Sequence, residues 1–232
     1  KSITDASSIT NGRSAVVGMP KAHYCSGKFI PWMRALKPVC FLSTMLYTGN
    51  VQQLNRGDTD VGVATFEKKI IRDLLSKIPH QVSFKTYPSI RYPDDDPILE
   101  FASSFPNISN FTKMIDFRYL GACTRIIVTS RTSSTLGWCM ASGKPVVLVD
   151  FPGCPIPNNL HEQFSESIFL FDGSCPDDLA KAVELLSRPI EEIENLWSQK
   201  ALARHALMSE NFDSGTQTAG VSALNEILTT LR

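Results

Sequence analysis

Short, almost uninterrupted apolar runs are the feature of this sequence that most restricts its fold. Five of them read PVCFLST (38–44), QVSFKTY (81–87), RIIVTS (125–130), PVVLVD (145–150) and SIFLFDG (167–173). A strand with one solvated face alternates apolar and polar residues, whereas a strand of a parallel sheet that is covered on both faces is apolar almost throughout. The runs therefore predict a parallel sheet buried between two layers of helices.

Helical patterns separate these runs, as a parallel sheet requires. The predicted helices cover 66–78, 97–105, a short piece LGWCMAS (136–142) and 176–188, with a brief helix at 117–123, a further short strand NISNFT (107–112), and two closing helices at about 190–209 and 215–231. In the first of them one helical face is apolar and carries Phe66, Ile70, Ile71, Leu74, Leu75 and Ile78. Strands that alternate with helices predict an α/β fold, a Rossmann-like doubly wound parallel sheet with extra C-terminal helices.

The length of 232 residues fits one large domain, or one domain with appendages. We expect a linker at 1–37, which begins with a Ser-, Thr- and Asn-rich tail and carries a short strand (15–19) and a short helix (27–36). Residues 38–232 are expected to form the Rossmann-like domain. Because the sequence starts at Lys1 without a methionine, we expect it to be a fragment or to have been trimmed.

Composition excludes several classes of protein. The formal charge is zero, so no overall field draws the chain to nucleic acid. No apolar run approaches the roughly 20 residues that span a bilayer, and no signal-peptide pattern opens the chain. The six cysteines form no CxxC pair and have no zinc spacing with a histidine, which favours the reducing cytosol. The four histidines are scattered, so we expect no metal site.

The stretch VTSRTSSTLGW lies between one predicted strand and the short helix that follows it. Ser133, Ser134 and Thr135 therefore fall near a helix N-terminus, where unpaired N–H groups and the helix dipole favour an anion. Hydroxyl groups there can add hydrogen bonds to phosphate oxygens. The alternative is that one hydroxyl merely caps the helix. Gly143 is placed to end this helix as its C-terminal cap.

Three further loops follow the carboxyl ends of predicted strands, where open α/β sheets bind ligands. In the first of them, 84–92, Lys85 and Arg91 could neutralise a phosphate. The alternative is that Lys85 is an ordinary solvated residue of the loop. A long polar loop, 43–60, could contact a ligand through Gly49, Asn50, Asn55 and Arg56, or could be a surface excursion.

In the fourth loop, 150–164, either Asp150 or Glu162 could hold a sugar hydroxyl, although charged strand ends are common in any protein. The acidic run 94–96 precedes Pro97 and suits helix capping better than metal binding.

The order of these motifs resembles the C-terminal half of GT-B glycosyltransferases, in particular the transferases of bacterial lipopolysaccharide and capsule biosynthesis. The resemblance covers roughly 38–230 and rests on KTYP, on VTSRTSSTLGWCMASGKPVVLVD and on a later helix that opens PDDL. In related enzymes a Lys-x-His-Pro turn and a Ser/Thr-rich loop hold the donor's phosphate. Lys85, Tyr87 and Pro88 match the turn, with Tyr87 in place of the histidine, and Ser133, Ser134 and Thr135 match the loop.

The resemblance implies a donor-binding half that transfers a sugar from a nucleotide-sugar, with a CMP-sugar suggested by the sialyl- and Kdo-type enzymes. The residues assigned to the donor are Lys85, Tyr87, Arg91, Ser130, Arg131, Thr132, Ser133, Ser134, Thr135, Gly49, Asn50, Asn55 and Arg56, with Asp150 and Glu162 assigned to the sugar. The implied partners are the donor, a glycan acceptor and a missing N-terminal acceptor domain, with no metal or other cofactor and no nucleic acid.

The same resemblance implies a cytoplasmic location, including peripheral association with the inner face of the membrane. Without the other half, the chain is expected to lack activity on its own. Two rival functions remain open from the sequence: a nucleotide-sugar epimerase of the same architecture, and a non-catalytic binding or scaffolding module.

Overall fold

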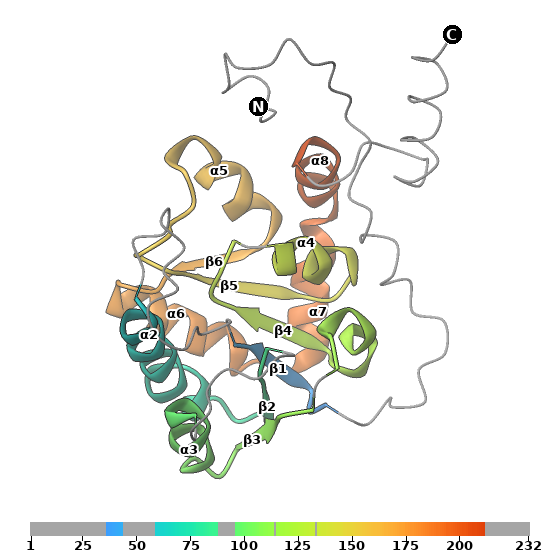
Figure 1. Ribbon diagram of the computed structural model, residues 1–232. Coiled ribbons are helices and arrows are strands. Elements are labelled where there is room, and N and C mark those ends of the chain that lie inside the picture. Colours follow the sequence, from blue (N-terminus) through green and yellow to red (C-terminus); the bar gives the residue numbers. More distant parts are fainter. Residues whose placement is uncertain (1–35, 44–58, 88–95, 114, 133, 212–232) are drawn as a thin grey trace, which may run out of the picture.

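A six-stranded, all-parallel sheet forms the centre of the protein (Figure 1). The structure is a computed structural model, and it describes residues 36–43, 59–87, 96–113, 115–132 and 134–211. The strands are β1 (Val39–Leu42), β2 (Val82–Lys85), β3 (Ile108–Phe111), β4 (Ile126–Thr129), β5 (Val146–Asp150) and β6 (Phe169–Asp172), in the order β3-β2-β1-β4-β5-β6. This order confirms the predicted doubly wound α/β fold.

Helices cover both faces of this sheet. They are α2 (Asp60–Asp73), α3 (Pro97–Ser103), α4 (Ser134–Ala141), α5 (Asn158–Ser167), α6 (Pro176–Leu186), α7 (Ile190–Gln199) and α8 (Ala201–Asn211), with short 3₁₀ turns at Leu75–Lys77, Phe117–Tyr119 and Gly121–Cys123. In Figure 1, α2, α3 and α6 lie to one side of the strands and α4 lies to the other. In the described ranges, no helix combines the length and the apolar character needed to cross a membrane.

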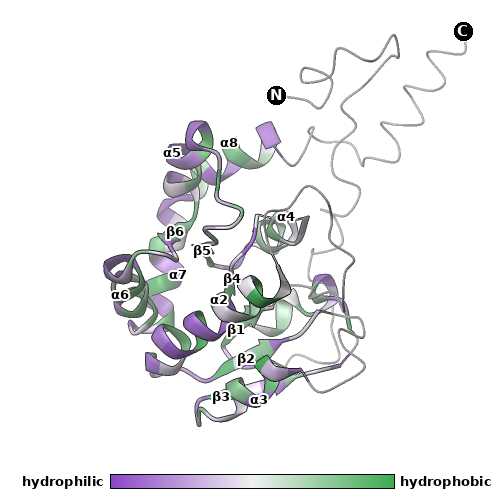
Figure 2. Cartoon of the chain, turned by 60° about the vertical axis from the view of Figure 1, so that its left-hand side comes forward, coloured by the Kyte–Doolittle hydropathy of each residue, from purple (hydrophilic) through white to green (hydrophobic). Residues whose placement is uncertain are grey.

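The strands are apolar because both of their faces are buried. Every residue of β1, β2 and β4 is buried, as the uninterrupted runs predict. Figure 2 shows the apolar colouring concentrated on the strands, while the surface helices carry hydrophilic stretches. The buried cysteines Cys40, Cys123 and Cys139 belong to this core as small apolar side chains. Burial raises the pKa of the Cys40 thiol far above its usual value, which keeps it protonated and unreactive.

Local capping sets where α2 and α3 begin. Asp96 accepts a hydrogen bond from the Ile98 amide (2.9 Å) and precedes Pro97 at the first helical position, so the last residue of the acidic run caps α3 as expected. Helix α2 begins at Asp60, six residues before the predicted start. The reason is Thr59, whose hydroxyl accepts from the Gly62 amide at 3.0 Å and caps the helix from within the polar loop.

Two other predicted boundaries were wrong. The loop expected over 150–164 turns into helix α5 at Asn158, directly after Pro157. The single helix expected at 190–209 is broken at Lys200, between α7 and α8. The Lys200 ammonium donates to the carbonyls of Ser165 (2.7 Å) and Glu166 (3.1 Å), so the break ties α8 to the C-terminus of α5. The strand and helix expected within 1–35 and the helix at 215–231 lie outside the described residues.

Helix α7 is fastened to the amino edge of the sheet. Arg125, just before β4, forms a two-pronged ion pair with Glu194 (2.9 and 2.6 Å) and a second ion pair with Glu191 (2.7 Å). The indole N–H of Trp197 donates to the carbonyl of Gly143 at 3.1 Å. Gly143 has a φ of +71° and ends α4 as the predicted glycine cap.

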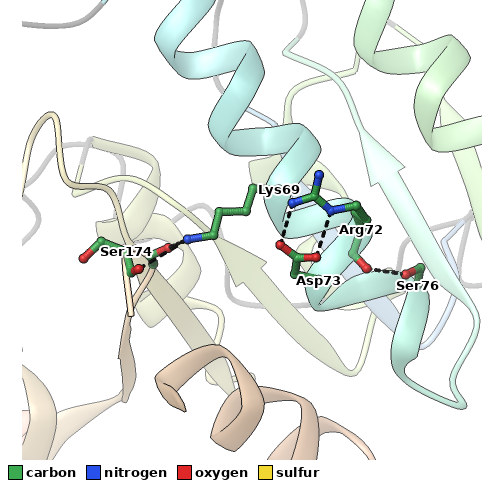
Figure 3. A network of polar contacts seen from close by, with 6 residues as sticks. Lys69, Arg72, Asp73, Ser76 and Ser174 are labelled. Carbon is green, nitrogen blue, oxygen red and sulfur yellow. Dashed lines mark hydrogen bonds and ion pairs between the residues drawn. The ribbon is translucent and has the colours of Figure 1, made fainter. Parts of the chain in front are cut away.

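Helix α2 is fastened near the carboxyl edge, at the loop after β6. The Lys69 ammonium donates to the carbonyls of Gly173 (2.8 Å) and Ser174 (3.4 Å), as Figure 3 shows beside the Arg72–Asp73 pair on the same helix. Phe66 lies against Gly173 so closely that a β-carbon there would approach the Phe66 ring to 2.3 Å. Only a residue without a side chain fits this position.

Replacing Gly173 with alanine is expected to lower the free energy of unfolding by about 1–3 kcal/mol, the usual cost of overpacking a core. The added methyl group would also meet the Asp150 carbonyl oxygen at 2.7 Å, and that backbone atom cannot rotate away. Urea unfolding measures the change.

Gly121→Ala is the matched control, because the nearest atom to its added carbon lies at an ordinary 3.5 Å. An equal loss of stability in both variants would contradict the tight fit at Gly173.

Candidate functional site at the carboxyl edge of the sheet

The topological switch point of the sheet lies between the neighbouring strands β1 and β4. After β1 the chain continues toward β2 and β3, and after β4 it continues toward β5 and β6. The carboxyl ends of the strands are level, because Leu42 lies opposite both Lys85 and Thr129. In doubly wound sheets, ligands bind outside the carboxyl ends at such a point.

Buried polar side chains gather at this edge. In the described part of the chain, the buried charged residues are Glu67, Lys85 and Arg131. The residues that end or follow β1, β2 and β4 also include four buried hydroxyl residues, Ser43, Thr86, Thr129 and Ser130. Buried charged groups are rare because removing them from water is costly. The other buried polar residues, Ser83, Thr124 and Ser167, are uncharged and bond to backbone groups nearby. The edge between β2 and β4 is therefore exceptional within this core.

Glu67 is the site residue that sequence reasoning missed. It lies in the middle of α2, its exposed fraction is 0%, and its carboxylate accepts a hydrogen bond of 2.7 Å from the Ser43 hydroxyl just after β1. A signal was present: Glu67 precedes Ile70 by three residues and Ile71 by four, so the helical period places it on the buried face. An acid on that face needs partners, and Ser43 is one of them.

Lys85 lies at the end of β2, as the sequence predicts. Its side chain is only 2% exposed; the ammonium donates to the Thr86 carbonyl and lies 5.7 Å from the centre of the Phe111 ring. The amide of Ser43 donates to the Lys85 carbonyl at 3.0 Å, so the Lys85 and Glu67 segments meet through Ser43. Tyr87, two residues further on, is 38% exposed.

The loop after β4 leads directly into α4. Ser130 and Arg131 are buried, whereas Thr132 and Thr135 are partly exposed. Helix α4 starts at Ser134, so Thr135 lies in its first turn, shortly after β4, whereas Ser133 and the Ser134 side chain lie outside the described part of the chain. The buried residues Leu136, Cys139 and Met140 anchor the helix in the core.

Arg131 crosses from the end of β4 to the end of β5. Its guanidinium lies 4.6 Å from the centre of the Phe151 ring, within the range of a cation–π contact. Six donor candidates lie outside the described residues: Gly49, Asn50, Asn55, Arg56, Arg91 and Ser133. Their assignment stays a prediction.

Asp150 and Glu162, predicted to hold a sugar, occupy different surroundings. The Asp150 carboxylate accepts from the Ile156 amide at 3.0 and 3.3 Å and so closes the proline-rich loop after β5. Burial raises the pKa of Asp150, opposed by that hydrogen bond and by the His161 charge. Glu162 is exposed on α5. Within the described ranges, no three His, Cys, Asp or Glu side chains converge in a way that could hold a metal ion.

Comparison with known proteins identifies the architecture. No family model and no curated protein matches the sequence. A sucrose-phosphate synthase from Thermosynechococcus elongatus is similar in structure, with a TM-score of 0.51 and 14% identity over 84% of this chain and 46% of its own. A glycosyltransferase from Rickettsia africae ESF-5 gives a TM-score of 0.54 and 14% identity over 91% of this chain and 54% of its own.

The chain spans about half the length of these structures. At such low identity the similarity shows the fold alone. That fold is the Rossmann-like architecture that the resemblance to one half of GT-B glycosyltransferases implies.

Asp150→Asn is expected to gain stability relative to the wild type as pH rises. The pKa of Asp150 is higher in the folded chain than the value of about 3.9 in an unfolded one. The wild-type protein therefore loses stability as pH rises from about 4 through the folded pKa, while asparagine has no charge to bury and still offers an oxygen to Ile156. Urea unfolding of both proteins between pH 4 and pH 7 measures the difference.

Asp172→Asn is the control of opposite sign. Hydrogen bonds from Ser174 lower the pKa of Asp172, so the wild-type side chain stabilises the fold above the unfolded pKa and loses that effect as pH falls. If the stability difference for Asp150→Asn did not change with pH, Asp150 would not be a desolvated carboxyl group.

Proposed function

We propose that this chain binds the nucleotide part of a nucleotide-sugar donor at the carboxyl edge of β1, β2 and β4, as half of a glycosyltransferase. The observation that carries the proposal is the group of buried charged residues, Glu67, Lys85 and Arg131, at the switch point beside the start of α4. The fold is compatible with this role, since it is similar to that of a glycosyltransferase and a sucrose-phosphate synthase.

Charge at this edge suits a phosphate. Arg131 and Lys85 are two basic side chains against one acid, Glu67, which gives the buried group a formal excess of positive charge. Water is largely excluded around them, so their interaction with an anion is weakened less than at an exposed surface. The N–H groups of the first turn of α4 and the hydroxyl of Thr135 add donors at the same edge.

These groups would also serve the transfer of the sugar. When the bond between sugar and nucleotide breaks, negative charge grows on the phosphate oxygens of the leaving nucleotide. Donors that are already in place stabilise that charge without having to reorganise, and this is usually a large part of catalysis. We expect the charge to be met by these side chains and N–H groups, without a metal cofactor.

The acceptor belongs to a second part of the proposed enzyme. In the proposal, a domain that the described residues do not include binds a glycan acceptor, and the two parts enclose the reacting sugar. A CMP-sugar donor, a bacterial surface polysaccharide as product, and action in the cytoplasm, including the inner face of the membrane, follow from the motif resemblance and complete the proposal.

Ser134→Ala and Thr135→Val are each expected to weaken nucleotide binding by about tenfold to a hundredfold, the usual worth of one hydrogen bond to a charged group. Isothermal titration with CMP, UDP, GDP and ADP, each separately, measures the affinity. One of these nucleotides should bind and should also raise the melting temperature.

Ser187→Ala serves as the control, because this exposed serine lies at the C-terminus of α6, where its hydroxyl bonds only to the Val183 carbonyl in the described structure. If none of the four nucleotides binds, a scaffolding role replaces the proposed one. If one binds but both α4 variants keep wild-type affinity, the nucleotide site lies elsewhere.

A further inference from the structure

Arg131 is held by a continuous stack of buried residues that starts two strands away. The stack runs from Gly173 after β6, through Phe66 on α2 and Phe151 after β5, to Arg131 after β4. We propose that Phe151 is a positioning residue, which fixes the Arg131 guanidinium for the anionic part of the ligand. This inference rests on the proposed function, because it assigns Arg131 to the donor phosphate.

The contact between Arg131 and Phe151 is the first step. Both side chains are buried, with exposed fractions of 8% and 7%, and the guanidinium lies 4.6 Å from the ring centre. An arginine side chain otherwise samples many rotamers, and ordering it on binding would cost affinity. The aromatic ring orders it before the ligand arrives. A planar guanidinium that stacks on an aromatic ring can still donate from the N–H groups at its edge.

Phe66 supports the ring of Phe151 from α2. Their ring centres are 4.8 Å apart and the planes are tilted by 57°, an arrangement within the favourable range for aromatic pairs. The next residue along α2 is Glu67, which is bonded to Ser43 at the end of β1. The same turn of α2 therefore sets both Arg131, through Phe151, and the acid at the switch point.

Gly173 fixes Phe66 in turn. Any β-carbon at this position would overlap the Phe66 ring, and the loop itself is held because the Gly173 amide donates to the Asp150 carbonyl (3.1 Å). On the other side, the Gly173 carbonyl accepts from Lys69 of α2 (2.8 Å), the contact drawn in Figure 3. Each residue of the stack, from Gly173 in the loop after β6 to Arg131, is therefore in contact with the next.

Phe151→Leu tests the proposal, because leucine keeps an apolar side chain but has no ring face. We expect nucleotide affinity to fall about fivefold to tenfold, within the range of a desolvated cation–π contact. In the Arg131→Met background the same change should have no further effect, since the guanidinium is already gone. Titration calorimetry of the four proteins measures this double-mutant cycle.

Phe169→Leu is a matched control. Phe169 is equally buried at 8%, pairs with Trp197 at 5.9 Å and has the Lys200 ammonium 5.9 Å from its ring centre, but it begins β6 and so lies at the amino edge. It should lose stability without losing affinity. Wild-type affinity in Phe151→Leu, or an undiminished loss in the Arg131→Met background, would overturn the positioning role.

If the wild type binds none of the four nucleotides, the proposed function fails. A second measurement, which needs no ligand, then still tests whether Phe151 positions Arg131. Phenylglyoxal labels arginine side chains that can leave their contacts, and peptide mass spectrometry follows each site. Loss of the Phe151 ring should raise the labelling rate of Arg131 several-fold, while Arg72 on the surface of α2 keeps its rate. An unchanged rate at Arg131 would show that Phe151 does not hold it. Phe66→Leu, one contact further back, should act in the same direction as Phe151→Leu.

Discussion

Helices cover both faces of this short parallel sheet, so charged side chains can be placed mainly at the amino and carboxyl ends of its strands. The rest of the structure depends on that constraint. The strands are mostly four residues long, and nearly every side chain on them must be apolar to pack against one helix layer or the other. The charged residues of the strands, Lys85, Asp150 and Asp172, accordingly stand at the last position of their strands. Because the ends of β1, β2 and β4 are level, these ends lie side by side.

The two edges of the sheet use polar groups differently. At the amino edge, Arg125 and Thr124 meet acids of α7 and backbone carbonyls, which fastens the closing helices to the sheet. At the carboxyl edge, Glu67, Lys85 and Arg131 are buried, and their placement requires support from α2 and from the ends of neighbouring strands. Such a concentration of buried charge costs stability. The proposed binding role would give the core a reason to retain it.

The sequence predicted the strands because their signal is local: each apolar run became a strand within a residue or two. The alternation of strands and helices then implied a doubly wound parallel sheet, whereas the order of its strands comes from the structure. Caps formed by single residues were seen where they stood beside a helix pattern, as at Pro97 and Gly143. They were missed where they stood inside a polar loop, as at Thr59. Helix α5 was hidden by the prolines before it, which dominated the interpretation of that segment.

The site was predictable only in part. Lys85, Ser130 and Arg131 could be placed at the carboxyl edge because each follows a strand. Glu67 was missed because the other residues on its face of the helix are apolar, and that face was interpreted only as part of the core. The contacts of Phe66 with Phe151 and Gly173 join residues far apart in the sequence, and no local pattern indicates them. They depend on how α2 packs against the ends of β5 and β6, which only the folded chain determines.

Hydrogen–deuterium exchange with and without nucleotide tests the central claim most directly, since it locates the ligand without any substitution. The account predicts slower exchange in the presence of the nucleotide for peptides that cover the end of β4 and the first turn of α4. Peptides from α7, at the amino edge, should be unchanged. Protection confined to the amino edge or to the closing helices would contradict the assignment of the carboxyl edge as the binding site.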